Sequence, residues 1–179
     1  MKIISLFCGA GGLDLGFKEA GFKIQMAVDK EEAFLKTFSH NFENSRTRNL
    51  DLGDESVLEQ IPKADIVIAG PPCQGFSNMG NKNSADPRNY LFEKYVDIVN
   101  LVKPKCFVFE NVKGMFTMFE GRFFDEIINS FLESYGQKRC SSYIEQISLK
   151  FSSFSNNLTS PLQTGQIVFS ASSSSHACL

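Results

Sequence analysis

The chain has 179 residues, of which 42% are hydrophobic and 21% charged, a composition that fits one ordinary globular domain. Its formal net charge of −2 gives no overall basic field, so it neither demands a nucleic-acid partner nor excludes one. The five cysteines are odd in number and scattered, which argues against a disulfide framework. Without a C-x-x-C pair and with only two histidines, a zinc site is not expected. No stretch approaches the roughly 20 apolar residues of a membrane span, and we expect a cytoplasmic chain.

Short apolar runs alternate with amphipathic stretches along the first 135 residues. We expect strands over residues 2–7, 22–28, 48–52, 64–70 and 105–111, and helices over residues 13–21, 30–42, 55–61, 91–102 and 122–135. Strands that alternate with helices at short spacing predict an α/β fold with a doubly wound, mostly parallel sheet.

The composition changes near Gly136, and serine becomes frequent in the last part of the chain. We therefore divide the sequence into a domain of residues 1–140 and a Ser-rich tail of residues 141–179. One strand could form over Tyr143–Phe151, and the chain beyond residue 152 is expected to be irregular or disordered, because its composition buries little apolar surface.

A glycine loop, FCGAGGLDLGF, follows the first expected strand and opens the first helix. Glycines there allow the backbone to approach a ligand closely. Asp29, at the end of the second strand, is placed to accept both hydroxyls of a ribose. The glycine spacing differs from G-x-G-x-x-G, and no phosphate-binding loop with its lysine is present. A nucleoside without a pyrophosphate fits best, and S-adenosylmethionine is the obvious candidate.

Two further strand ends carry reactive groups. In GPPCQGFS, residues 70–77, prolines end the strand and hold Cys73 on a stiff turn, and the next strand ends in FENVKG with Glu110. The carboxyl ends of strands in an open α/β sheet form the ligand crevice, so both side chains are expected to face one pocket. A thiolate nucleophile beside a carboxylic acid suits covalent catalysis with acid–base help. Cys8 and Cys106 are interpreted as packing residues.

SLFCGAGGLDLGF, Asp29, IAGPPCQGFS, DPRNYLF and FENVKGM resemble the successive motifs of the DNA (cytosine-5) methyltransferases, in order from residue 3 to about residue 135. The resemblance implies a Rossmann-like fold that uses S-adenosylmethionine, incomplete at the C-terminus. It implies that Cys73 attacks carbon 6 of a flipped-out cytosine, while Glu110 holds or protonates ring nitrogen 3 and carbon 5 accepts the methyl group.

The resemblance also implies the remaining site residues and the partners. The cofactor residues would be Phe7, Gly9, Ala10, Gly11, Gly12, Asp29, Asp51 and Pro72. The residues that contact the substrate or the DNA would be Gln74, Ser77, Arg88 and Asn111. Double-stranded DNA is the expected substrate, in a restriction–modification system, and no metal is expected.

The family pattern continues past FENVKG with an arginine motif, a target-recognition region and a closing segment, none of which is legible here. The chain could be one subunit of a split enzyme whose second polypeptide supplies recognition, or a truncated or frame-shifted remnant. It could also be a non-catalytic cofactor- or DNA-binding module. Methylation of cytosine in RNA stays open as a further alternative.

Overall fold

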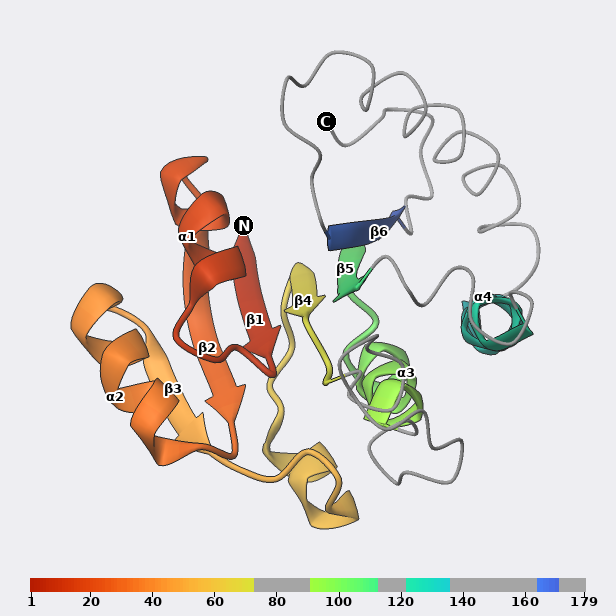
Figure 1. Ribbon diagram of the computed structural model, residues 1–179, viewed down its shortest axis with the longest axis horizontal. Helices are drawn as coiled ribbons and strands as arrows, with labels where there is room; N and C mark the ends of the chain where they lie inside the picture. The colour runs from red at the N-terminus through yellow and green to blue at the C-terminus, as the bar shows by residue number, and fades with distance from the viewer. Residues whose placement is uncertain (73–90, 113–121, 136–163, 171–179) are drawn as a thin grey trace.

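The computed structural model describes residues 1–72, 91–112, 122–135 and 164–170. Its strands are β1 (Lys2–Leu6), β2 (Lys23–Asp29), β3 (Arg46–Asn49), β4 (Ile66–Ala69), β5 (Cys106–Val112) and β6 (Thr164–Ser170). Its helices are α1 (Gly12–Glu19), α2 (Glu32–Asn41), α3 (Leu91–Val102) and α4 (Arg122–Tyr135), together with a 3₁₀ helix at Glu55–Gln60. Figure 1 shows these elements along the chain.

The strands form one sheet in the order β3-β2-β1-β4-β5-β6. The first five are parallel, and β6 runs antiparallel to β5. From β1 the chain moves outward through β2 to β3 and then crosses to β4 on the other side of β1. This reversal is a topological switch point, and ligands of open α/β sheets bind outside the carboxyl ends of the strands at such a point. The α/β fold class predicted from the sequence is confirmed.

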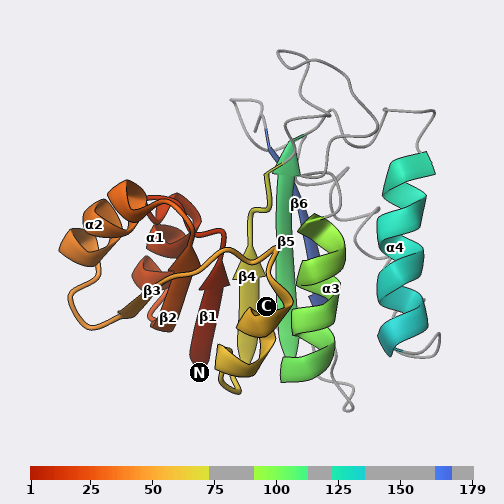
Figure 2. The same cartoon turned by 90° about the horizontal axis from the view of Figure 1, so that it is seen from below.

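Each face of the sheet has its own hydrophobic core, because side chains alternate between the faces along a strand. Helices α1 and α2 pack beside β1, β2 and β3, and α3 and α4 pack beside β5 (Figure 2). The larger cluster joins α3 and α4 to residues such as Leu6, Val67 and Phe107. The smaller cluster joins α2 to residues such as Ile3, Ala27 and Ile68.

Tyr95 of α3 ties the larger core to the centre of the sheet. Its side chain is fully buried, and its hydroxyl lies 3.2 Å from the carbonyl oxygen of Val67 on β4 and 3.0 Å from that of Val108 on β5. The ring packs against Phe107, Phe109 and Phe131. A hydrogen bond at the buried end of an aromatic ring lets α3 carry a polar group into the core without leaving it unsatisfied.

Strand β6 differs from the sequence-based expectation of irregular chain beyond residue 152. It pairs with β5 along its whole length, from Cys106 opposite Ser170 to Val112 opposite Thr164. Residues 167–169 are Ile, Val and Phe, types that are favoured in strands, and the backbone of β5 offers them hydrogen-bond partners. The serine-rich composition around this short run favours irregular chain and so conceals the signal. The strand expected over Tyr143–Phe151 lies outside the described residues.

The pairing of β6 predicts that it contributes to stability. A chain ending after Gln163 lacks the strand, and we expect its free energy of unfolding to fall by on the order of 2 kcal/mol, because hydrogen bonds to β5 are lost and the backbone of β5 becomes an open sheet edge. A chain ending after Ser170 keeps the strand and serves as the control. Urea unfolding followed by far-ultraviolet circular dichroism compares them, and equal stabilities of the two truncated chains would contradict the assignment.

Candidate functional site

Four strand ends meet at one edge of the sheet because the strands are parallel and in register. Leu6 of β1 lies opposite Val28 of β2 and Ala69 of β4, and Ala69 lies opposite Phe109 of β5. The segments that follow these residues therefore leave the sheet together. They are the glycine loop, Asp29, the start of the GPPCQ turn and Glu110, so the sequence motifs form one candidate site.

The glycine loop combines a structural glycine with two open ones. Gly11 has φ +94°, and a Cβ built on it would lie 2.5 Å from the ring of Phe42 and 2.9 Å from that of Phe38. Its lack of a side chain is therefore needed for α1 to approach α2. A Cβ built on Gly9 or Gly12 meets no described atom within 4 Å. These two positions leave room for a ligand against the backbone.

Phe7 enters the loop in the left-handed region, with φ +52°. This conformation is unfavourable for a bulky residue and is found mainly where the surroundings impose it, often at ligand sites. The ring is partly buried and packs against the larger core cluster. Phe7 therefore begins the loop in a fixed orientation, as an aromatic wall for a base would require.

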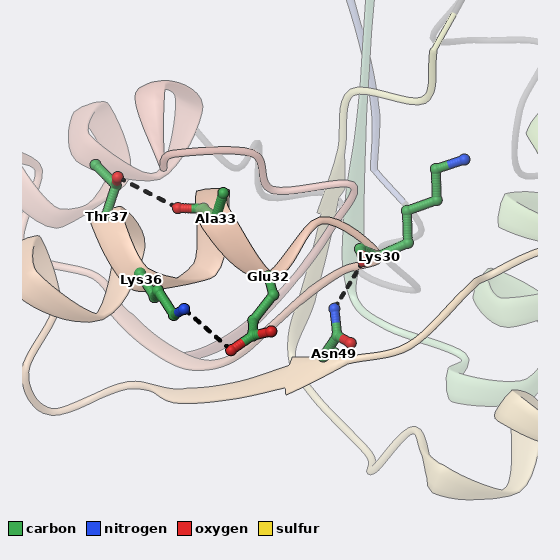
Figure 3. Close-up of polar contacts among 6 residues, drawn as sticks. All are labelled: Lys30, Glu32, Ala33, Lys36, Thr37 and Asn49. Atoms are coloured by element: carbon green, nitrogen blue, oxygen red, sulfur yellow. Dashed lines mark hydrogen bonds and ion pairs between the residues drawn. The ribbon is translucent and has the colours of Figure 1, made fainter.

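Asp29 is held in place at the end of β2 by bonds to both carboxylate oxygens. Oδ2 accepts the amide N–H of Gly9 at 2.8 Å, and Oδ1 accepts that of Glu31 at 2.9 Å. The Asn49 side chain donates to the carbonyl oxygen of Lys30 at 2.7 Å (Figure 3). It also lies 3.3 Å from the carbonyl oxygen of Asp29, and the two contacts together hold the turn into α2. Each carboxylate oxygen retains a lone pair for a further donor, so the side chain can still accept ribose hydroxyls.

Helix α2 begins directly after this turn, and two side-chain contacts lie in its first turns. Glu32 pairs with Lys36 at 3.3 Å, one helical turn later, and the Thr37 hydroxyl lies 3.5 Å from the carbonyl oxygen of Ala33 (Figure 3). The ion pair is solvent-exposed and contributes little energy. Its place in the first turn of the helix lets Glu32 also complement the helix dipole.

Asp51 lies in the segment that follows β3 at the same edge. Its Oδ1 accepts the amide N–H of Gly53 at 2.9 Å, and its carbonyl oxygen accepts that of Asp54 at 3.0 Å. Three residues after Asp51, Asp54 caps the 3₁₀ helix by accepting the amide N–H of Ser56, and this hydrogen bond lowers the pKa of the Asp54 carboxyl. Asp51 is exposed and constrained by its own turn. Within the described part of the chain, its second carboxylate oxygen accepts no hydrogen bond, as an acceptor for an amino group requires.

Glu110 lies against the start of the GPPCQ turn. A Cβ built on Gly70 would be 3.1 Å from Oε2 of Glu110, so any side chain at position 70 would crowd the carboxyl group. Burial raises the pKa of the Glu110 carboxyl above its usual value, because a low-dielectric environment disfavours the charged form. A carboxyl group that holds its proton more firmly is suited to donate a hydrogen bond to a base.

Asn111 connects β5 to the same turn from inside the protein. It is 5% exposed, and its Nδ2 donates to the carbonyl oxygen of Pro71 at 3.4 Å. This contact joins the segment that carries Glu110 to the segment that leads to Cys73. The structure thus gives Asn111 a positioning task, and its predicted contact with DNA stays a prediction. Pro72 is half-buried beside it.

The predicted residues Cys73, Gln74, Ser77 and Arg88 lie outside the described residues. The last described residue of this turn is Pro72, which directly precedes Cys73 in the sequence. Among the described residues, no group of three or more His, Cys, Asp or Glu side chains could hold a metal ion. No helix in the described part of the chain is long and apolar enough to cross a membrane.

Asp14, in the first turn of α1, is a site feature that sequence reasoning missed. Its side chain is fully buried, and in the described part of the chain neither carboxylate oxygen makes a hydrogen bond of good geometry. Burial raises the pKa of the Asp14 carboxyl from its ordinary 3.8 to about 6, and the neighbouring Ser5 hydroxyl and the backbone oppose this only in part. An acid in the first turn of a helix is usually an exposed partner of the helix dipole, so the burial of Asp14 cannot be inferred from the helical pattern alone.

Cys8, within the glycine loop, behaves as a packing residue, as expected. It is buried in the smaller core cluster, and its thiol lies 3.5 Å from the carbonyl oxygen of Gly9. Burial raises the pKa of the Cys8 thiol well above its ordinary value, and the negative charges of Asp14 and Asp29 raise it further. Cys8 therefore stays protonated and is a poor nucleophile. Cys106, half-buried in β5, packs against the same cluster.

Residues 1–137 match the family model described as C-5 cytosine-specific DNA methylase. The chain is 43% identical over 146 residues to the Type II methyltransferase M1.HphI of Haemophilus parahaemolyticus, an alignment that covers 77% of this chain and 39% of the relative. It is 41% identical over 135 residues to M.FnuDI of Fusobacterium nucleatum, with 75% and 39% covered. The matched part of the chain thus spans about two fifths of the length of these curated relatives.

The fold is similar to solved methyltransferase structures. A protein described as a prophage-encoded DNA modification methyltransferase of E. coli superposes with a TM-score of 0.61 and 31% identity, over 73% of this chain and 37% of that one. A DNMT2 mutant of Spodoptera frugiperda superposes with a TM-score of 0.54 and 27% identity, over 73% and 41%. Both of these proteins are methyltransferases, so the fold described above is similar to folds found in that class of enzyme.

The buried carboxyl of Asp14 predicts a pH-dependent difference in stability. Replacing Asp14 by Asn removes the charge at nearly constant shape, and at pH 8 we expect this variant to be more stable than wild type by on the order of 2 kcal/mol. Between about pH 6 and pH 4 the folded wild type binds a proton that the unfolded chain does not, so wild-type stability rises as the pH falls and the difference shrinks.

Chemical unfolding at pH 4, 6 and 8 measures this difference. Glu126→Gln, an exposed change on α4, is the control and should leave the pH dependence unaltered. A loss of stability at pH 8 on Asp14→Asn would show that the carboxylate has a favourable partner.

Proposed function

The chain belongs to the C-5 cytosine-specific DNA methylase family, and from this premise we propose that it carries the catalytic half of a DNA (cytosine-5) methyltransferase of a restriction–modification system. The observation that carries the proposal is the meeting of motifs at one edge of the sheet. The Glu110 carboxyl lies against Gly70 of the GPPCQ turn, and Asp29 bonds to the glycine loop at the neighbouring strand ends. The substrate class is cytosine in double-stranded DNA.

The glycine loop and its neighbours fit S-adenosylmethionine. Open space beside Gly9 and Gly12 admits a ligand against the backbone, and Asp29 is fixed with lone pairs to spare. When bound, the cofactor supplies an electrophilic methyl group on a sulfonium. Phe7 would pack on the adenine and Asp29 would accept the ribose hydroxyls. Asp51 would accept from the adenine amino group, and Ala10 and Pro72 would complete the walls.

The chemistry on the cytosine would belong to Cys73 and Glu110. The Cys73 thiolate forms a bond to carbon 6, and the displaced electron pair of the ring double bond makes carbon 5 nucleophilic. Glu110 donates a proton or a hydrogen bond to ring nitrogen 3, where negative charge develops. After carbon 5 has gained the methyl group and lost its proton to a base, the bond to Cys73 breaks and the thiolate leaves. The burial that raises the pKa of Glu110 supports its role as a donor.

DNA contacts and target recognition would be shared with other parts of the enzyme. Gln74, Ser77 and Arg88 would contact the DNA backbone beside the flipped base, with Asn111 holding the turn beneath them. We propose that a second polypeptide contributes to target recognition. Such an enzyme would act in the cytoplasm.

Covalent trapping tests the proposed chemistry. Fluorine at carbon 5 of cytosine cannot leave as a proton does, so duplex DNA containing 5-fluorocytosine, with S-adenosylmethionine, should yield a DNA-linked band on a denaturing gel. Cys73→Ala should abolish the band, and Glu110→Gln should slow its formation by about 100-fold or more, the usual contribution of a positioned acid. Cys178→Ala is the matched cysteine control. A band that survives Cys73→Ala would refute the assignment of the nucleophile.

The proposed second polypeptide is tested by complementation. The part of M1.HphI that lies outside the matched region, produced as a separate chain, should increase adduct formation by this protein at least tenfold and confine it to particular DNA sequences. The same fragment mixed with the Cys73→Ala variant is the control and should form no adduct. Full, sequence-specific adduct formation by the chain alone would show that no partner is needed.

A further inference from the structure

The Asp14 carboxylate, in the first turn of the helix that follows the glycine loop, has no ion pair in the described part of the chain. It is fully buried, and neither of its oxygens makes a hydrogen bond of good geometry there. A buried ionisable group without a partner costs several kcal/mol in general and is retained mainly where function requires it. Asp14 therefore raises the question of which positive group it serves.

The surroundings of Asp14 are acidic. The Cys8 thiol feels the negative charges of both Asp14 and Asp29, so the two carboxylates act on the same turn of the loop. The lysine of α1, Lys18, is engaged elsewhere: it donates to the carbonyl oxygen of Asn41 at 2.7 Å and lies over the ring of Phe42. Within the described residues no cationic side chain forms an ion pair with Asp14, and the carboxylates of Asp14 and Asp29 make the environment of Cys8 negative.

This environment disfavours phosphate and favours a cation. Helix N-termini that follow glycine loops commonly bind phosphate through their free N–H groups and the helix dipole. An acid in the first turn of α1 opposes a second anion there. The methionine end of S-adenosylmethionine carries a sulfonium, an ammonium and one carboxylate, and so has a net charge of +1. Once the methyl group is lost, S-adenosylhomocysteine has no sulfonium and no net charge.

We infer that Asp14 supplies the buried counter-charge for the cationic methionine end of the methyl donor and thereby makes the loop distinguish the donor from its uncharged product; this inference rests on the proposed function. Asp14 acts through the loop by Coulomb attraction, which is strong in a site shielded from water. When the carbon–sulfur bond breaks and the carbon–carbon bond to cytosine forms, the sulfur keeps the electron pair of the broken bond and becomes neutral. The attraction to Asp14 then weakens, which favours release of the product.

Ligand binding by the full-length chain tests the inference without a catalytic readout. Isothermal titration calorimetry at pH 7.5 would measure S-adenosylmethionine, S-adenosylhomocysteine and sinefungin, whose amine replaces the sulfonium with a non-transferable cation. Asp14→Asn should weaken binding of both cationic ligands about tenfold relative to wild type and leave binding of S-adenosylhomocysteine within twofold. Asp14→Ala should give the same ratio, which separates loss of charge from a changed shape.

Asp29→Asn is the matched control, because the ribose is common to all three ligands. It should weaken all three equally. An Asp14→Asn variant that loses all three ligands equally, or that keeps the wild-type ratio, would overturn the inference while leaving the proposed function in place. Failure of the wild-type chain to bind any of the three would instead count against the proposed cofactor, and the inference would fall with it.

Discussion

The site depends on the register of the central parallel strands. Because side chains alternate along a strand, a slip of one residue between β4 and β5 would exchange Phe109, which is fully buried in the larger core, with Glu110. The buried Phe109 ring thus fixes the direction of the Glu110 carboxyl. The Tyr95 hydroxyl, within reach of carbonyl oxygens on both strands, adds a second constraint on the same pair. The hydrophobic core and the candidate chemistry are therefore set by one and the same pairing.

Links across the strand ends convert this register into a connected site. Asp29 bonds to Gly9, which joins the end of β2 to the loop after β1. Asn111 bonds to Pro71, which joins the end of β5 to the segment after β4. Each link uses a short polar side chain and a backbone group, so its geometry is set by the strands themselves. Two carboxyls nearby, Asp14 and Glu110, are held where burial disfavours their charge, and the cores on the two faces of the sheet offset that cost.

The sequence predicted most of this arrangement because its strong signals are local. Strands that end at glycine and proline, and a helix whose apolar spacing stops before Pro104, place β4, β5 and α3 within a few residues of their observed bounds. Strand β6 was not expected, because the serine-rich composition of the tail outweighs the short apolar run at residues 167–169, and its pairing partner β5 is distant in the sequence. Asp14 was missed for a related reason: whether a first-turn acid is exposed or buried depends on how the helix packs, which a helical pattern alone does not state.

The two outer strands of the sheet, β3 and β6, differ in their length and direction. At one end β3 is only four residues long and carries Arg46 and Arg48, features that discourage pairing with another chain. At the other end β6 covers β5, the strand that ends in Glu110. Strands β1, β2, β4 and β5 then lie inside the sheet, where both neighbours fix their register. The geometry of the candidate site is thus determined by strands that each have a paired neighbour on both sides.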